Sequence, residues 1–152
     1  MGGKVIREAT LQDVPALVEM GQLFLTSTAY ESLVGNNPDQ MRVTAEYLIS
    51  GDAGTVLVAE NATGALVAMI GLQLFPHHIS GQRTVGEAFL WVDPQSRGTL
   101  GVRLLKAAYA WAQTMGAEKM QLVAPIESGV GAIYEHLGYT AIEVAYQKDV
   151  AA

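Results

Sequence analysis

Residues 92–105 read Val-Asp-Pro-Gln-Ser-Arg-Gly-Thr-Leu-Gly-Val-Arg-Leu-Leu, and this stretch decides how the chain is interpreted. An apolar strand at 83–92 leads into it, and a helix with one apolar face, from Leu100 to Met115, leads out of it. A glycine-containing turn at a helix start points several backbone N–H groups at one spot, where the helix dipole adds partial positive charge. The stretch therefore predicts a phosphate-binding turn.

Two common phosphate-binding motifs do not fit this turn. A Walker A loop requires Gly-Lys-Ser/Thr, which does not follow here. The dinucleotide fingerprint Gly-x-Gly-x-x-Gly is missing as well, and the strands before the turn are expected to form hairpins.

The remaining pattern predicts an α/β fold in the order β-α-α-β-β-β-α-β-α-β. Helix-start signals stand at Thr10 and at Asn37-Pro38, and a short helix from Val130 closes at Gly138. Short turns make neighbouring strands antiparallel, whereas the helix after Leu100 makes its flanking strands parallel. We expect a mixed, twisted sheet of six or seven strands with helices on both faces. The strands identified are 4–9, 55–60, 65–75, 83–92, 119–124 and 139–148.

The composition indicates the number of domains and excludes several classes of site and partner. The 152 residues, half of them apolar, predict a single domain over 1–152. The absence of cysteine excludes disulfides and thiolate sites. A net charge of −6 without a basic stripe argues against nucleic acid as a partner. The start lacks the apolar core of a signal peptide and no apolar run could span a bilayer, so we expect a cytoplasmic protein without a membrane partner.

The central stretch resembles the motif of the GNAT superfamily of N-acetyltransferases, Gln/Arg-x-x-Gly-x-Gly/Ala after a strand ending in Val-x-Pro. Here Val92-Asp-Pro is followed by Gln-Ser-Arg-Gly-Thr-Leu at 95–100. Residues 132–139, Ala-Ile-Tyr-Glu-His-Leu-Gly-Tyr, are similar to the family's late Tyr-x-x-x-Gly-Phe/Tyr motif. The resemblance covers nearly the whole chain and is greatest to short stand-alone bacterial and phage members. It departs at Leu100, where the family usually has Gly or Ala.

The resemblance implies acetyl-coenzyme A (acetyl-CoA) as cosubstrate and no metal. Backbone N–H groups of the turn would hold the pyrophosphate, with charge from an arginine, and the splayed end of the preceding strand would take the pantetheine arm and stabilise the oxyanion. The implied cofactor-binding residues are Leu90, Trp91, Val92, Arg97, Gly98, Thr99, Leu100, Gly101, Val102 and Arg103.

Two side chains are candidate catalysts. Tyr134 stands where the family often places a tyrosine near the sulfur, so it would protonate the leaving thiolate, although it equally fits a packing face. Glu87 would accept the proton of the attacking ammonium, or it is simply a solvated strand residue. Phe75, His77 and His78 are candidate substrate contacts, although adjacent loop histidines are most often just exposed.

The function predicted is acetyl transfer from acetyl-CoA to a primary amine of a small molecule or peptide by direct attack. One alternative is a non-catalytic acyl-CoA-binding module, suggested by Leu100 in the glycine position. Another is an α/β domain without a CoA site that acts by dimerisation. A homodimer is also expected if the last strand completes its pairing on a second copy.

Overall fold

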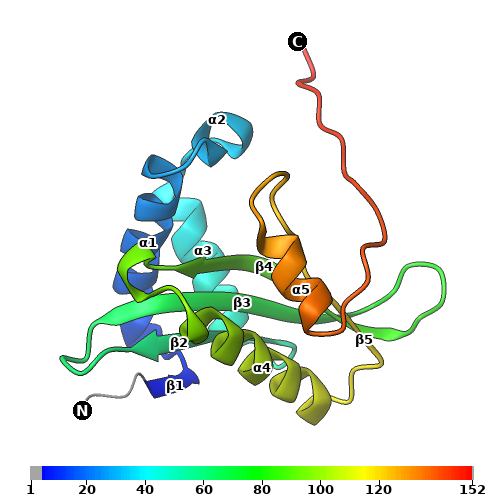
Figure 1. Cartoon of the computed structure of the whole chain (residues 1–152), viewed down its shortest axis with the longest axis horizontal. Helices are drawn as coiled ribbons and strands as arrows, with labels where there is room; N and C mark the ends of the chain where they lie inside the picture. The colour runs from blue at the N-terminus through cyan, green and yellow to red at the C-terminus, as the bar shows by residue number, and fades with distance from the viewer. Residues whose placement is uncertain (1–4, 152) are drawn as a thin grey trace. The chain divides into compact units, whose positions relative to one another are not determined.

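The computed structural model describes residues 5–151, which divide into two compact units at Gln121–Leu122 (Figure 1). Lys4, where the first predicted strand begins, lies outside the described residues. The strands are β1 Val5–Glu8, β2 Gly54–Glu60, β3 Leu66–Pro76, β4 Arg83–Val92 and β5 Lys119–Gln121. The helices are α1 Val14–Thr26, α2 Tyr30–Val34, α3 Pro38–Ser50, α4 Thr99–Thr114 and α5 Val130–His136, with 3-10 turns η1 Leu11–Asp13 and η2 Pro94–Ser96.

The first unit is built on one mixed sheet in the order β1-β2-β3-β4-β5. The first four strands pair antiparallel with their neighbours, and β5 joins β4 in parallel after the α4 crossover. This confirms the predicted strand directions and the mixed α/β class.

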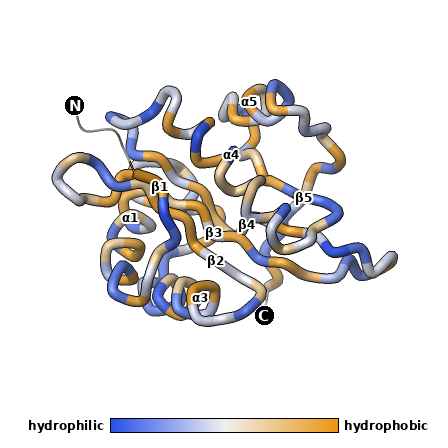
Figure 2. The backbone as a smooth tube through the Cα atoms, turned by 90° about the horizontal axis from the view of Figure 1, so that it is seen from below, coloured by the Kyte–Doolittle hydropathy of each residue, from blue (hydrophilic) through white to orange (hydrophobic). Residues whose placement is uncertain are grey.

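Helices cover both faces of this sheet, as the sequence predicted. α1 and α3 pack on one face, around a core that includes Leu17, Leu48, Val58 and Trp91 (Figure 1). The strand residues that alternate with these, such as Ile70, are also fully buried and point to the other face, where α4 contacts β2, β3 and β4. Hydrophobic residues accordingly run through the middle strands, and hydrophilic ones gather in the connections (Figure 2).

Local signals explain where the helices begin. The Asn37 side chain accepts a hydrogen bond from the Gln40 N–H at 3.1 Å, and Pro38 occupies the first turn of α3. The Asp13 carboxylate accepts the Thr10 N–H at 2.7 Å ahead of α1, and it also receives both ends of the Arg7 guanidinium. Arg7 bonds Glu60 of β2 as well, so one cation ties β1, β2 and the start of α1 together.

The secondary structure differs from the prediction in three details. The sheet has five strands rather than six or seven, because residues 139–151 form neither strand nor helix and β5 ends at Gln121 instead of 124. Residues 141–151 are exposed, and a segment becomes a strand only where its backbone groups find a ladder partner. The short helix α2 was also not predicted; it lies before Gly35, whose φ of 77° terminates it.

Candidate functional site

The carboxyl-terminal half of β4 has an edge that no strand of the described chain covers. Pairing with β5 involves only Thr84, Val85 and Gly86, so residues 87–92 pair in the sheet with β3 alone. A register shift sits beside this point, because Gly71 faces Phe89 while Leu72 faces Glu87, which leaves Ala88 as the extra residue of a bulge. A strand edge without a pairing strand can accept an extended ligand by main-chain hydrogen bonds.

The turn after β4 leads into an uncapped helix. Asp93 closes η2 by accepting the Gln95 N–H at 3.3 Å. Gly98 then adopts φ 118°, a conformation that side chains rarely allow, and α4 begins at Thr99. Within residues 5–151, no side chain caps the start of this helix, and its first turn holds no acidic residue. Its first N–H groups and its dipole therefore favour an anion.

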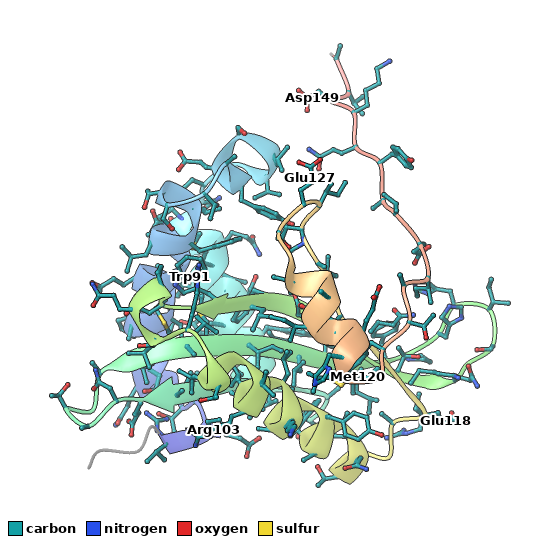
Figure 3. The ribbon with its side chains drawn as sticks, in the orientation of Figure 1. Trp91, Arg103, Glu118, Met120, Glu127 and Asp149 are labelled. Carbon is teal, nitrogen blue, oxygen red and sulfur yellow. The ribbon has the colours of Figure 1, made fainter. Side chains whose placement is uncertain are left out.

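Arg97 lies between the strand end and the helix start. Its Nε donates to the carbonyl oxygen of Val92 at 3.1 Å, and its guanidinium carbon lies 5.0 Å from the ring centroid of Trp91. Among residues 5–151, Arg97 forms no salt bridge with a carboxylate. Trp91 itself is buried where β4 passes α1 (Figure 3).

The departure at Leu100 has a structural explanation. Leu100 is only 3 % exposed, so its side chain packs in the core of the first unit and not on the surface of the turn. Gly101 follows in the first turn of α4, and a Cβ built there would meet only Val92 Cγ2, at 3.9 Å. Leu100 therefore gives no steric support to the non-catalytic alternative.

Other predicted cofactor residues have varied exposure. Leu90, Val92 and Val102 are half-buried, whereas Thr99 is exposed. Arg103 is exposed on α4, on the opposite side of the sheet from Trp91 (Figure 3).

Glu87 of β4 and Phe75 of β3 lie on opposite faces of the sheet. A Cβ on Gly86 would come within 2.9 Å of the Phe75 ring, so that ring covers the Gly86 face of the strand. Glu87, the next residue in regular register, points the other way and is half-buried. A base on one face and a substrate contact on the other do not form one cluster.

His77 and His78 lie in the hairpin loop between β3 and β4, at the opposite end of β4 from Val92. The His77 Nδ1 accepts the Ile79 N–H at 3.2 Å, and the His78 ring centroid is 6.4 Å from that of Phe75. The strand between this loop and Val92 is roughly 30 Å long at about 3.3 Å per residue. The three predicted substrate contacts thus cluster with one another and not with the turn.

Tyr134 belongs to the second unit, on α5. It is 6 % exposed, its hydroxyl donates to the carbonyl oxygen of Val123 at 2.9 Å, and its ring centroid is 6.0 Å from that of Tyr139. This hydrogen bond satisfies the buried phenol within its own unit.

A comparison with protein families identifies the chain. The model of the acetyltransferase (GNAT) family matches residues 21–139. The chain belongs to the GNAT acetyltransferase family. Members of this family are acyl-CoA-dependent acetyltransferases. Comparison with proteins of curated function gives no significant match.

Solved structures share the fold of this GNAT protein at low sequence identity. The aminoglycoside N-acetyltransferase AAC(6')-Iy in complex with CoA has a TM-score of 0.80 at 15% identity, over 99% of this chain and 97% of that chain. The ribosomal-protein-alanine N-acetyltransferase from Brucella melitensis biovar Abortus 2308 has a TM-score of 0.74 at 19% identity, over 97% and 99%. The aminoglycoside 6'-N-acetyltransferase AAC(6')-Ih from Acinetobacter baumannii has 0.75 at 16%, over 98% and 100%.

The structure of this GNAT protein brings together the turn, the strand end and Arg97. Sequence reasoning missed two aromatic neighbours of this site, Phe24 and Tyr30. Phe24 on α1 lies 5.3 Å from the Trp91 ring centroid and 5.1 Å from that of Tyr30. Phe24 fell on the apolar stripe of its helix, whereas nothing in the sequence marked Tyr30. Among residues 5–151 there is no cluster of three or more potential metal ligands and no helix long and apolar enough to cross a membrane.

Proposed function

We propose that this GNAT protein is an N-acetyltransferase that transfers an acetyl group from acetyl-CoA to a primary amine of a small molecule or peptide. The observation that carries the proposal is the end of β4, residues 88–92, which pairs with β3 alone and leads through the turn at 93–98 to the start of α4. The proposed enzyme uses the whole chain, residues 1–152, as one acetyltransferase domain.

The end of β4 and the turn after it offer groups that could bind two parts of CoA, the pantetheine arm and the pyrophosphate. Main-chain groups of Leu90, Trp91 and Val92 would pair with the amides of the pantetheine arm as an added strand does. Backbone N–H groups of residues 97–102 would hold the pyrophosphate, and Arg97, which has no carboxylate partner in the described chain, would supply charge. The side chain of Leu100 packs in the core and does not lie over the surface of the turn.

Acetyl-CoA supplies the activated acyl group. A main-chain N–H near Val92 would stabilise the negative charge that develops on the carbonyl oxygen. Glu87, directly or through a water molecule, would take the proton from the acceptor ammonium, since an alkyl amine is protonated near neutral pH. Tyr134 would deliver a proton to the departing thiolate, which requires its hydroxyl to leave the Val123 carbonyl.

The acceptor is proposed to be cationic. The net charge of −6 favours the approach of an ammonium compound. The names of proteins with similar structures also support an amine acceptor, since they include an aminoglycoside N-acetyltransferase and a ribosomal-protein-alanine N-acetyltransferase. We place such an enzyme in the cytoplasm.

Thermal unfolding with acetyl-CoA, and with adenosine as control, tests the cosubstrate. A ligand at 100 times its dissociation constant stabilises by about 2.7 kcal/mol, which raises the melting temperature of a domain this size by roughly 5–10 °C. Thiol release with a panel of amines then tests transfer. No shift with millimolar acetyl-CoA would contradict the proposal, and a shift without thiol release for any amine would favour the non-catalytic binding module.

A further inference from the structure

Four side chains from four parts of the first unit form a continuous stack beside the proposed pyrophosphate site. Tyr30 of α2 contacts Phe24 of α1, Phe24 contacts Trp91 of β4, and the guanidinium of Arg97 lies over the Trp91 ring. Trp91 is 7 % exposed and belongs to the core cluster, whereas Arg97 is exposed. The buried Trp91 ring therefore lies within the stack, next to the exposed Arg97 at one of its ends.

This arrangement holds the Arg97 guanidinium in place without pairing its charge with a carboxylate. A guanidinium has five N–H donors in a planar fork. The Nε of Arg97 donates to the Val92 carbonyl oxygen, and the guanidinium carbon lies over the Trp91 ring. These two contacts restrict the rotation of a long side chain that forms no salt bridge among residues 5–151. The terminal nitrogens stay available to an anion, in an orientation set before the ligand arrives.

We propose that Trp91 is a positioning residue for acyl-CoA: its indole ring, backed by Phe24, holds the Arg97 guanidinium ready for the pyrophosphate. This inference rests on the proposed function, because it assigns a ligand to Arg97. It concerns the side chain of Trp91, whereas the main chain of the same residue is assigned to the pantetheine arm. Holding a flexible cation in its bound orientation raises affinity by reducing the entropy lost on binding.

A double-mutant cycle tests this proposal with the full chain. Acetyl-CoA dissociation constants are measured by titration calorimetry for wild type, Trp91→Leu, Arg97→Gln and the double variant. Arg97→Gln removes charged hydrogen bonds to phosphate and is expected to weaken binding about tenfold or more. Trp91→Leu is expected to weaken binding about two- to fivefold when Arg97 is present and to have no measurable effect in Arg97→Gln.

Two controls separate positioning from packing. Trp91→Phe keeps an aromatic ring in the core and should fall between wild type and Trp91→Leu, and it replaces the leucine variant if that protein does not fold. Trp111→Phe, on α4, makes the same change at a half-buried indole outside the stack and should bind acetyl-CoA as wild type does.

Each outcome has one meaning. Non-additive losses at Trp91 and Arg97 support the positioning role. Equal weakening by the Trp91 substitutions in both Arg97 backgrounds, or no weakening at all, overturns it while leaving the proposed function intact. Failure of the wild-type protein to bind acetyl-CoA would instead overturn the proposed function, and with it the assignment of a ligand to Arg97.

Discussion

The hydroxyl of Tyr134 donates a hydrogen bond to the main-chain carbonyl oxygen of Val123, at 2.9 Å. The same hydroxyl is the proposed proton donor to the departing thiolate, so it has both a structural and a catalytic interpretation. Removal of the hydroxyl has a different effect in each of these two roles. A structural hydrogen bond affects the free energy of unfolding, whereas a proton donor affects turnover.

Tyr134→Phe is therefore expected to lower turnover severalfold or more and to lower the free energy of unfolding by only about 1 kcal/mol. Steady-state thiol release and urea unfolding measure the two effects. Tyr109→Phe, at an exposed ring on α4, serves as control. Turnover equal to wild type in Tyr134→Phe would leave this residue with the Val123 bond alone.

Glu87→Gln tests the proposed base. If Glu87 takes the acceptor proton, the variant lowers kcat/KM most near neutral pH, where the acceptor amine is protonated, and least at high pH, where the amine has already lost its proton. Glu46→Gln is a charge-matched control on α3, where the exposed Arg42–Glu46 pair contributes little. A pH–rate profile that Glu87→Gln leaves unchanged would assign proton removal to water.

Gly101→Ala should raise the stability of the free protein and lower its affinity for acetyl-CoA. Ala is favoured over Gly in a helix, and the added Cβ meets only Val92 Cγ2 at 3.9 Å, so the free protein should gain roughly 0.5–1 kcal/mol. The same methyl group would crowd a phosphate lying on this backbone, so the affinity for acetyl-CoA should fall. Chemical unfolding and calorimetry test both parts, and an affinity that is unchanged would move the pyrophosphate away from Gly101.

Acid should weaken the ion network at the start of α1. Hydrogen bonds from Arg7 hold the pKa of the Asp13 carboxyl below its ordinary value, against the opposing effect of burial. A carboxylate with a lowered folded-state pKa stabilises the fold above its unfolded pKa of about 4, and this contribution is lost as the pH falls through the folded-state value. Asp13→Asn should therefore melt below wild type at pH 7.

The melting-temperature difference between wild type and Asp13→Asn should shrink as the pH falls below about 4. Melting curves of both proteins between neutral and acidic pH measure this. Asp149→Asn changes an exposed carboxylate of the C-terminal segment and should follow wild type throughout. A constant difference at every pH would show that Asp13 contributes through its packing and not its charge.

Several features could be predicted from the sequence because they depend on neighbouring residues. The Asn37-Pro38 start of α3, the antiparallel strands β2, β3 and β4, and the apolar face of α4 all follow from local chemistry or periodicity. The turn at 93–98 likewise follows from its proline and glycine. Family membership depends on these local motifs, so it too could be read from the sequence.

The last predicted strand shows where such reasoning fails. Residues 139–148 alternate in part as a strand does, yet the structure forms no strand there. Alternation indicates only that a segment would fit a sheet, whereas a strand also requires a neighbouring backbone, which local sequence does not specify.

Contacts between distant residues decided the rest of the site. Leu100 in the glycine position suggested a non-catalytic module, but packing directs this side chain into the core. The sequence named Arg97 as a cation without showing that Trp91 and the Val92 carbonyl hold it. It named Glu87 as a base and Phe75 as a substrate contact without showing that the two side chains lie on opposite faces of the sheet. The sequence determined which chemical groups are present and in which local elements, because periodicity and capping act between neighbours. The tertiary structure alone decided which groups meet, because side-chain direction depends on register, bulges and core packing between segments far apart in the chain.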